Sequence, residues 1–138
     1  MTFEPQRVTV VLFEGFELLD VFGPVQLLQA APEVTVVFAG PTGDPVASSQ
    51  GVEVVPTISY EQIEPTDILL VPGGKGTRQL ARDESFLSWL RGLGAQAPWV
   101  ASVCTGSAVL AAAGLLEGYA ATSNKRAFAW ASSFGESV

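Results

Sequence analysis

Cys104 is the residue in this sequence with the clearest capacity for chemistry. It is the only cysteine, and it lies in residues 103–107 (VCTGS), between an apolar run typical of a strand and an alanine-rich run typical of a helix. Such a turn places its residue at the carboxyl edge of a parallel sheet, where open α/β folds bind ligands. The start of a helix favours the thiolate, which is the nucleophilic form. Lone cysteines are often small buried apolar residues, but this context favours a nucleophile.

A glycine-rich turn follows a second apolar run. Residues 72–76 read PGGKG directly after DILLV, and glycines there would let backbone N–H groups approach and hold an anion. The turn lacks the G-x-x-x-x-G-K-[ST] spacing of a phosphate loop. Alone it is typical of a turn that ends a strand. Its interest comes from its predicted position at the same sheet edge as Cys104.

Asp20 is a carboxyl group surrounded by apolar residues in LLDVFGP. Burial would raise its pKa, so that a protonated Asp20 could donate a hydrogen bond or relay a proton. The alternative is a structural one, in which Asp20 caps a helix over residues 21–28. The sequence leaves both interpretations open. Glu14 and Glu17 flank the same loop, and we expect both to be solvated, with Glu17 as the alternative carboxylate.

Composition excludes several classes of protein. The chain has 138 residues and no histidine, which removes Cys-His and Ser-His-Asp catalysis and most zinc sites, so we expect neither metal nor cofactor. A net charge of −7 argues against a nucleic-acid partner, and no apolar run is long enough to span a membrane. One cysteine cannot form an intrachain disulfide, which predicts a cytoplasmic location. A small-molecule substrate remains the expected partner.

The elements that must position these residues alternate between strand and helix. The pattern predicts buried strands at residues 7–13, 33–40, 67–71 and 99–103, and an edge hairpin from residues 46–49 and 52–55. It predicts helices starting near Gly23-Pro24 and at residues 86–93, 105–116 and 125–131, with a further short strand at 120–123. Alternation of this kind indicates an α/β fold with a mostly parallel sheet and right-handed crossovers.

Four segments together resemble the ThiJ/PfpI superfamily, which is related to class I glutamine amidotransferases. They are LFEGFELLDVFGP, LLVPGGKGT, SVCTGSAVLAAAGLLEG and ATSNKRAFAW. The resemblance implies a flavodoxin-like three-layer α/β sandwich with a nucleophile elbow at the cysteine, and a homodimer. It also implies a single domain over residues 1–138 that is truncated at its C-terminus, because the family continues with a further strand and a helix.

Within the superfamily, the sequence most resembles the isocyanide hydratase group. The acid before Gly-Pro is Asp20 rather than glutamate, and Thr105 rather than histidine follows the cysteine. The resemblance implies that Cys104 is the nucleophile and that Asp20 holds the thiol or a water. It implies that the N–H of Thr105, with its hydroxyl, steadies developing charge, and that Gly74 supplies a further backbone N–H.

Two further residues are candidates for supporting roles. Glu17 is the second carboxylate near the site, and Asn124 stands where many relatives have a histidine, so a histidine-assisted peptidase mechanism finds no support. We expect Phe22 and Trp130 to contribute to a small apolar pocket.

The predicted function is a cysteine-dependent hydratase that converts an isocyanide to a formamide. Glyoxalase-like, deglycase or amidase-like chemistry at the same thiolate is an alternative. A ligand-sensing domain of an AraC-type transcription regulator is a second, non-enzymatic alternative. A third is a redox sensor in which Cys104 is oxidised.

Overall fold

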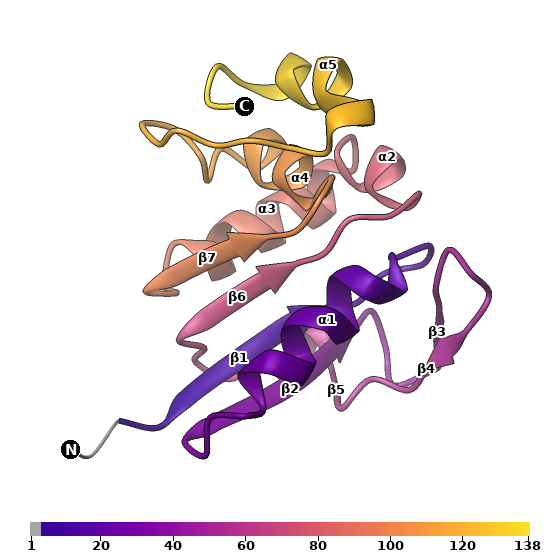
Figure 1. Ribbon diagram of the computed structural model, residues 1–138, viewed down its shortest axis with the longest axis vertical. Coiled ribbons are helices and arrows are strands. Elements are labelled where there is room, and N and C mark those ends of the chain that lie inside the picture. Colours follow the sequence, from indigo (N-terminus) through magenta and orange to yellow (C-terminus); the bar gives the residue numbers. More distant parts are fainter. Residues whose placement is uncertain (1–3) are drawn as a thin grey trace.

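Five parallel strands form the central sheet of the protein. The computed structural model describes residues 4–138, and the sheet has the order β5-β2-β1-β6-β7 (Figure 1). The strands are β1 (Gln6–Val11), β2 (Val34–Gly40), β5 (Ile58–Ser59), β6 (Ile68–Val71) and β7 (Trp99–Ser102). The four predicted buried strands are confirmed, with ends shifted by one or two residues, and so is the parallel α/β architecture.

The central strands are buried on both faces of the sheet, as is typical of a parallel sheet. Val10 and Val11 of β1, and Leu69 and Leu70 of β6, point to opposite faces, and at most 4% of each residue is exposed. Val8 lies opposite Val36 of β2 on one side and opposite a β6 residue on the other. This register brings the carboxyl ends of β1, β6 and β7 to one edge of the sheet.

Helices cover both faces of this sheet. Figure 1 shows α1 (Leu18–Leu28) in front of the strands and α3 (Glu84–Gly94) behind them. The start of α3 is fixed by Asp83, whose side chain accepts a hydrogen bond from the Phe86 N–H at 3.1 Å. The helix α4 (Gly106–Ala112) follows β7 and packs against β6 and β7.

The first helix begins earlier than the sequence predicted. We expected it to start near Gly23-Pro24, but α1 starts at Leu18 and holds Pro24 in its interior. Proline has no N–H, so the carbonyl of Asp20, four residues earlier, lacks its usual helical partner. Val21 is fully buried in the core, and this packing holds the helix together across the proline.

The last third of the chain is less regular than predicted. Helix α4 ends at Ala112 instead of continuing to residue 116, because the N–H groups of Gly114 and Leu115 turn back to the carbonyls of Ala111 and Leu110, at 2.9 and 3.0 Å. The strand predicted at residues 120–123 is wrong, since that segment pairs with no strand. The single helix predicted at 125–131 is instead η2 (Lys125–Ala127) and α5 (Phe128–Ala131), followed by η3 (Ser132–Phe134).

Several short elements complete the fold. The predicted edge hairpin is confirmed as β3 (Val46–Ala47) and β4 (Glu53–Val54), which pair antiparallel in a separate two-stranded sheet. The strand β5 and the helices η1 (Tyr60–Gln62) and α2 (Thr77–Leu80) were not predicted, because two to four residues are too few to show a period. Among residues 4–138, no helix has the length and apolar character needed to cross a membrane.

Candidate active site

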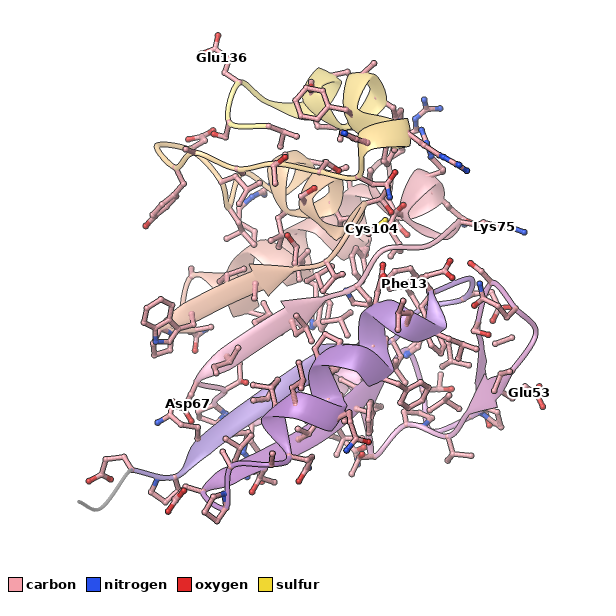
Figure 2. All side chains as sticks on the ribbon, viewed as in Figure 1. Phe13, Glu53, Asp67, Lys75, Cys104 and Glu136 are labelled. Atoms are coloured by element: carbon pink, nitrogen blue, oxygen red, sulfur yellow. The ribbon has the colours of Figure 1, made fainter. Side chains whose placement is uncertain are left out.

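Cys104 occupies a strained turn between β7 and α4. Its φ is 56°, and it is the only non-glycine residue with a positive φ among those that the structure describes. This left-handed conformation costs an L-residue about 1–2 kcal/mol. Strain of this kind persists only where surrounding structure imposes it, and it is concentrated at functional sites. Figure 2 shows the sulfur at the carboxyl edge of the sheet, beyond the end of β7.

Close packing around the turn imposes this conformation. Gly106, two residues after the cysteine, lies so near β6 that a Cβ at this position would be 2.1 Å from the Val71 carbonyl oxygen. The Cys104 carbonyl oxygen accepts hydrogen bonds from Ser107 Oγ at 3.0 Å and from Ser123 Oγ at 3.2 Å. The segment wrongly predicted as a strand therefore helps to fix the turn by supplying Ser123.

Asp20 lies in the first turn of α1, with its carboxyl group directed at the β6 end of the sheet. Its Oδ2 accepts a hydrogen bond from the Gly73 N–H at 3.0 Å, and only 8% of the residue is exposed. The helix-cap alternative is wrong, because the cap position is Glu17, three residues earlier, and that side chain makes no capping bond.

The environment of Asp20 favours its protonated form. Burial is the main cause and raises the pKa of this carboxyl above its ordinary value of 3.8. The hydrogen bond from the Gly73 N–H lowers this pKa, and the negative charge of Glu17 raises it. A side-chain hydrogen bond with Cys104 is a further, smaller cause that lowers it. Asp20 thus holds its proton more readily than an ordinary aspartate, and it lies beside the turn that carries the candidate nucleophile.

Gly73 marks the point where the predicted groups converge. A Cβ at this position would lie 2.7 Å from Asp20 Oδ2 and 2.8 Å from both the nitrogen and Oγ1 of Thr105. Only a residue without a side chain lets the β6–α2 loop pass between the acid and the cysteine turn. The structure therefore brings together three segments that are more than 30 residues apart in the sequence.

The Thr105 hydroxyl bridges the cysteine turn to the glycine-rich turn. Its Oγ1 accepts a hydrogen bond from the Gly74 N–H at 3.2 Å and lies 3.0 Å from Thr77 Oγ1. Thr77 Oγ1 also donates to the Gly74 carbonyl at 2.7 Å. A hydroxyl has one proton, so once Thr77 gives its proton to Gly74, the proton shared between the two hydroxyls is that of Thr105.

This hydrogen-bond network leaves few donors free to stabilise a negative charge that develops on a substrate. The Gly74 N–H and the Thr105 hydroxyl are both engaged within the protein, and either could serve a substrate only by exchanging its present bond. The Thr105 N–H has no acceptor within residues 4–138. Thr77 belongs to the site and was missed by the sequence analysis, although its position at the end of the motif LLVPGGKGT was the available signal.

A hollow of about 290 Å³ opens beside the cysteine. It is lined by Cys104 and Thr105 together with Glu17, Gly74, Lys75, Arg78 and Asn124. Glu17 accepts a hydrogen bond from Gln50 Nε2 at 2.5 Å, and the Asn124 side chain accepts one from the Arg126 N–H at 3.0 Å. Both predicted supporting residues therefore lie at the site.

The expected apolar pocket is wrong. Phe22 is 40% exposed and packs on Phe38, with 6.2 Å between ring centroids, and neither Phe22 nor Trp130 lines the hollow. Trp130 instead lies beneath Arg78, whose guanidinium carbon is 3.7 Å from the ring centroid. Polar and charged side chains surround the cysteine. No cluster of three metal-ligating side chains occurs within the described part of the chain.

Fold and site together define a class of α/β protein in which a cysteine occupies a left-handed turn at the carboxyl edge of a parallel sheet, with a buried acid beside it. The chain belongs to the DJ-1/PfpI family, whose model matches residues 6–135. The predicted superfamily and its flavodoxin-like fold are thereby confirmed.

Sequence similarity to individual proteins supports the assignment to this family. An isonitrile hydratase from Pseudomonas putida is 42% identical over 118 residues, which are 86% of this chain and 52% of that protein. An uncharacterized protein of the cpoL 5′ region of Streptomyces lividans is 36% identical over 128 residues, covering 90% of this chain and 91% of that protein.

Solved structures show the same fold. A ThiJ/PfpI family protein from Pseudomonas syringae superposes with a TM-score of 0.82 at 33% identity, covering 86% of this chain and 50% of that one. The chain thus spans about half the length of this protein and of the isonitrile hydratase.

Proposed function

We propose that the protein is a cysteine-dependent hydratase that adds water to the terminal carbon of an isocyanide and releases an N-substituted formamide. The observation that carries the proposal is the convergence at Gly73 of the buried Asp20 carboxyl and the strained turn that holds Cys104. The similarity to a protein named isonitrile hydratase, isonitrile being another word for isocyanide, supports the choice of substrate.

The first step joins the cysteine to the substrate. The Cys104 thiolate attacks the terminal carbon of R–N≡C, and that carbon takes the proton held by Asp20, which gives the thioimidate R–N=CH–S–Cys. A raised pKa suits Asp20 to this role, because a carboxyl that holds its proton more readily than an ordinary aspartate is more often in the form that can donate it. The carboxylate that remains is stabilised by the Gly73 N–H.

The second step consumes water. The Asp20 carboxylate takes one proton from a water molecule, the water oxygen adds to the thioimidate carbon, and the second water proton passes to the nitrogen. The C–S bond then breaks, so that the formamide R–NH–CHO leaves and the thiolate returns. In this proposal the Thr105 N–H, which has no acceptor within residues 4–138, stabilises charge at the cysteine turn during these steps. In sum, one isocyanide and one water give one formamide.

The proposal is tested by incubating the full chain with phenyl isocyanide and measuring N-phenylformamide by mass spectrometry. We expect formation of formamide by the protein, none above background for Cys104→Ala, and a loss of at least about a hundredfold in kcat for Asp20→Asn, the range of general acid–base catalysis. Turnover by Cys104→Ala equal to that of the native protein would overturn the proposal. A folded protein that binds the isocyanide without any turnover would favour the ligand-sensing alternative.

A further inference from the structure

Two cations face the hollow beside Cys104. Lys75 lies in the β6–α2 loop and Arg78 lies one residue into α2, and both line the same 290 Å³ space as the cysteine. Neither forms an ion pair with any described residue, whereas Arg7 and Arg91 elsewhere pair with glutamates. The lining therefore carries two positive charges, which face the carboxylate of Glu17 and, in its reactive form, the Cys104 thiolate. The whole chain, in contrast, has a net charge of −7.

Arg78 is held in position by an aromatic surface. Its guanidinium stacks on Trp130 of α5 at 3.7 Å from the ring centroid, and Trp130 is itself packed edge-on against Phe134 at 5.0 Å between centroids. Stacking fixes the plane of the guanidinium and leaves its N–H edge free. A planar, oriented group of this kind is suited to bind a carboxylate through two parallel hydrogen bonds.

Lys75 supplies a second, outer charge. Figure 2 shows its side chain extending outward from the loop, farther from the ends of the strands than Cys104. An outlying cation attracts an approaching anion over roughly the Debye length, about 8 Å at physiological salt. The carboxylate of Glu17 is occupied in part by Gln50 Nε2, which weakens its opposition to an anion.

We propose that this hollow selects substrates that carry a carboxylate, which Arg78 binds while the reactive carbon faces Cys104. Given the proposed hydratase function, on which this inference rests for its reaction, the preferred substrate class is anionic isocyanides. Trp130 acts as a positioning residue, because it orients the guanidinium without lining the hollow.

The anion site is testable without any hydratase activity, because the chain has one thiol. The rates at which iodoacetate and iodoacetamide alkylate Cys104 are measured by intact mass, and their ratio reports the preference for a negative charge. We expect Arg78→Gln to lower this ratio about two- to fivefold. A change in the thiolate fraction affects both reagents equally and cancels in the ratio. Arg82→Gln is the matched control, because it removes the same charge from a residue outside the hollow and should leave the ratio as it is.

Three further variants separate binding geometry from charge. Trp130→Ala should lower the ratio and Trp130→Phe, which keeps an aromatic face, should largely retain it. Glu17→Gln should raise the ratio. An unchanged ratio in Arg78→Gln, or an equal fall in Arg82→Gln, would overturn the proposal, because the preference would then not depend on the oriented guanidinium.

A second arm connects the site to the reaction. The kcat/KM values for 4-isocyanobenzoate and for its neutral methyl ester are compared, and we expect the acid to be favoured in the native protein and to lose that advantage in Arg78→Gln. If neither compound is hydrated while the alkylation ratios behave as expected, the hydratase proposal fails and the anion site stands. If both are hydrated and Arg78→Gln changes neither ratio, the hydratase stands and the anion site fails.

Discussion

At the scale of single residues, the sequence indicated which side chains would meet and missed what surrounds them. Cys104 could be singled out because it follows an apolar run that ends at the sheet edge, Asp20 because apolar residues surround it, and Thr105 through the family resemblance. Arg78 could not, because it lies on a one-turn helix with no periodicity. The expectation of an apolar pocket failed for the same reason, since exposed cations give no signal of which hollow they face.

Asp20 should make the folded protein less stable as pH rises, which is the reverse of the usual effect of a carboxyl group. Its pKa is raised in the folded state, so the folded protein holds this proton more tightly, and the stabilisation is lost as pH rises through the range above 3.8. Asn at this position keeps an oxygen for the Gly73 N–H but does not titrate. We therefore expect the free energy of unfolding of Asp20→Asn, relative to the native protein, to increase between about pH 4 and pH 7.

Urea unfolding of both proteins at several pH values measures this difference. Every other carboxyl group is shared and cancels in the comparison, apart from Glu17, whose charge acts on Asp20. A relative stability of Asp20→Asn that falls as pH rises would mean that the ionised carboxylate is the favoured form, contrary to the role assigned to it.

At the scale of elements, packing decided what local preference could not. Strands β1, β2, β6 and β7 were predictable because long apolar runs admit few other structures. The start of α1 was not, because a proline signals a helix start and only the burial of Val21 shows that the helix runs through it. The end of α4 was also missed, since its apolar sequence continues to Leu116 while its backbone turns back at Gly114.

The contact between α4 and β6 at Gly106 predicts a sharp intolerance of size. Gly106→Ala would place a Cβ 2.1 Å from the Val71 carbonyl oxygen, which the backbone can relieve only by moving α4 away from the sheet. We expect a loss of about 2 kcal/mol or more in unfolding free energy, as for other overpacked sites, and slower alkylation of Cys104 if the turn is displaced.

Gly92 offers the control for that experiment. It lies in the interior of α3, and a Cβ there would meet nothing within 4 Å. Gly92→Ala should therefore stabilise the protein by about 0.5–1 kcal/mol, through helix propensity alone. Similar effects of the two substitutions would show that the α4–β6 contact is not as close as described.

At the scale of the whole molecule, overall charge and local charge act in opposite directions. The chain carries 7 Lys+Arg against 14 Asp+Glu, which repels anions at long range, yet two cations, Lys75 and Arg78, line the hollow beside Cys104. Long-range repulsion and local attraction are both screened by salt. Their relative size therefore decides how an anionic reagent responds to ionic strength.

We expect salt to have opposite effects on the native protein and on Arg78→Gln. Raising ionic strength from 0.01 M to 1 M shortens the Debye length from about 30 Å to about 3 Å, and should slow iodoacetate alkylation of the native protein because the local attraction is lost. In Arg78→Gln the remaining field is mainly repulsive. The same rise in ionic strength should therefore leave the rate of iodoacetate alkylation unchanged or increase it. Iodoacetamide provides the uncharged reference, and identical salt profiles for both proteins would contradict the local attraction.

The left-handed backbone at residue 104 has a consequence for the history of this chain. The conformational penalty belongs to the position, so it persists under substitution by serine or alanine and disappears only with glycine. A lineage released from any need for the sulfur would gain stability by that one replacement. The retention of cysteine at such a costly place is what continued selection on its reactivity would produce, and the drift of inactive descendants toward glycine is the pattern that would accompany its loss.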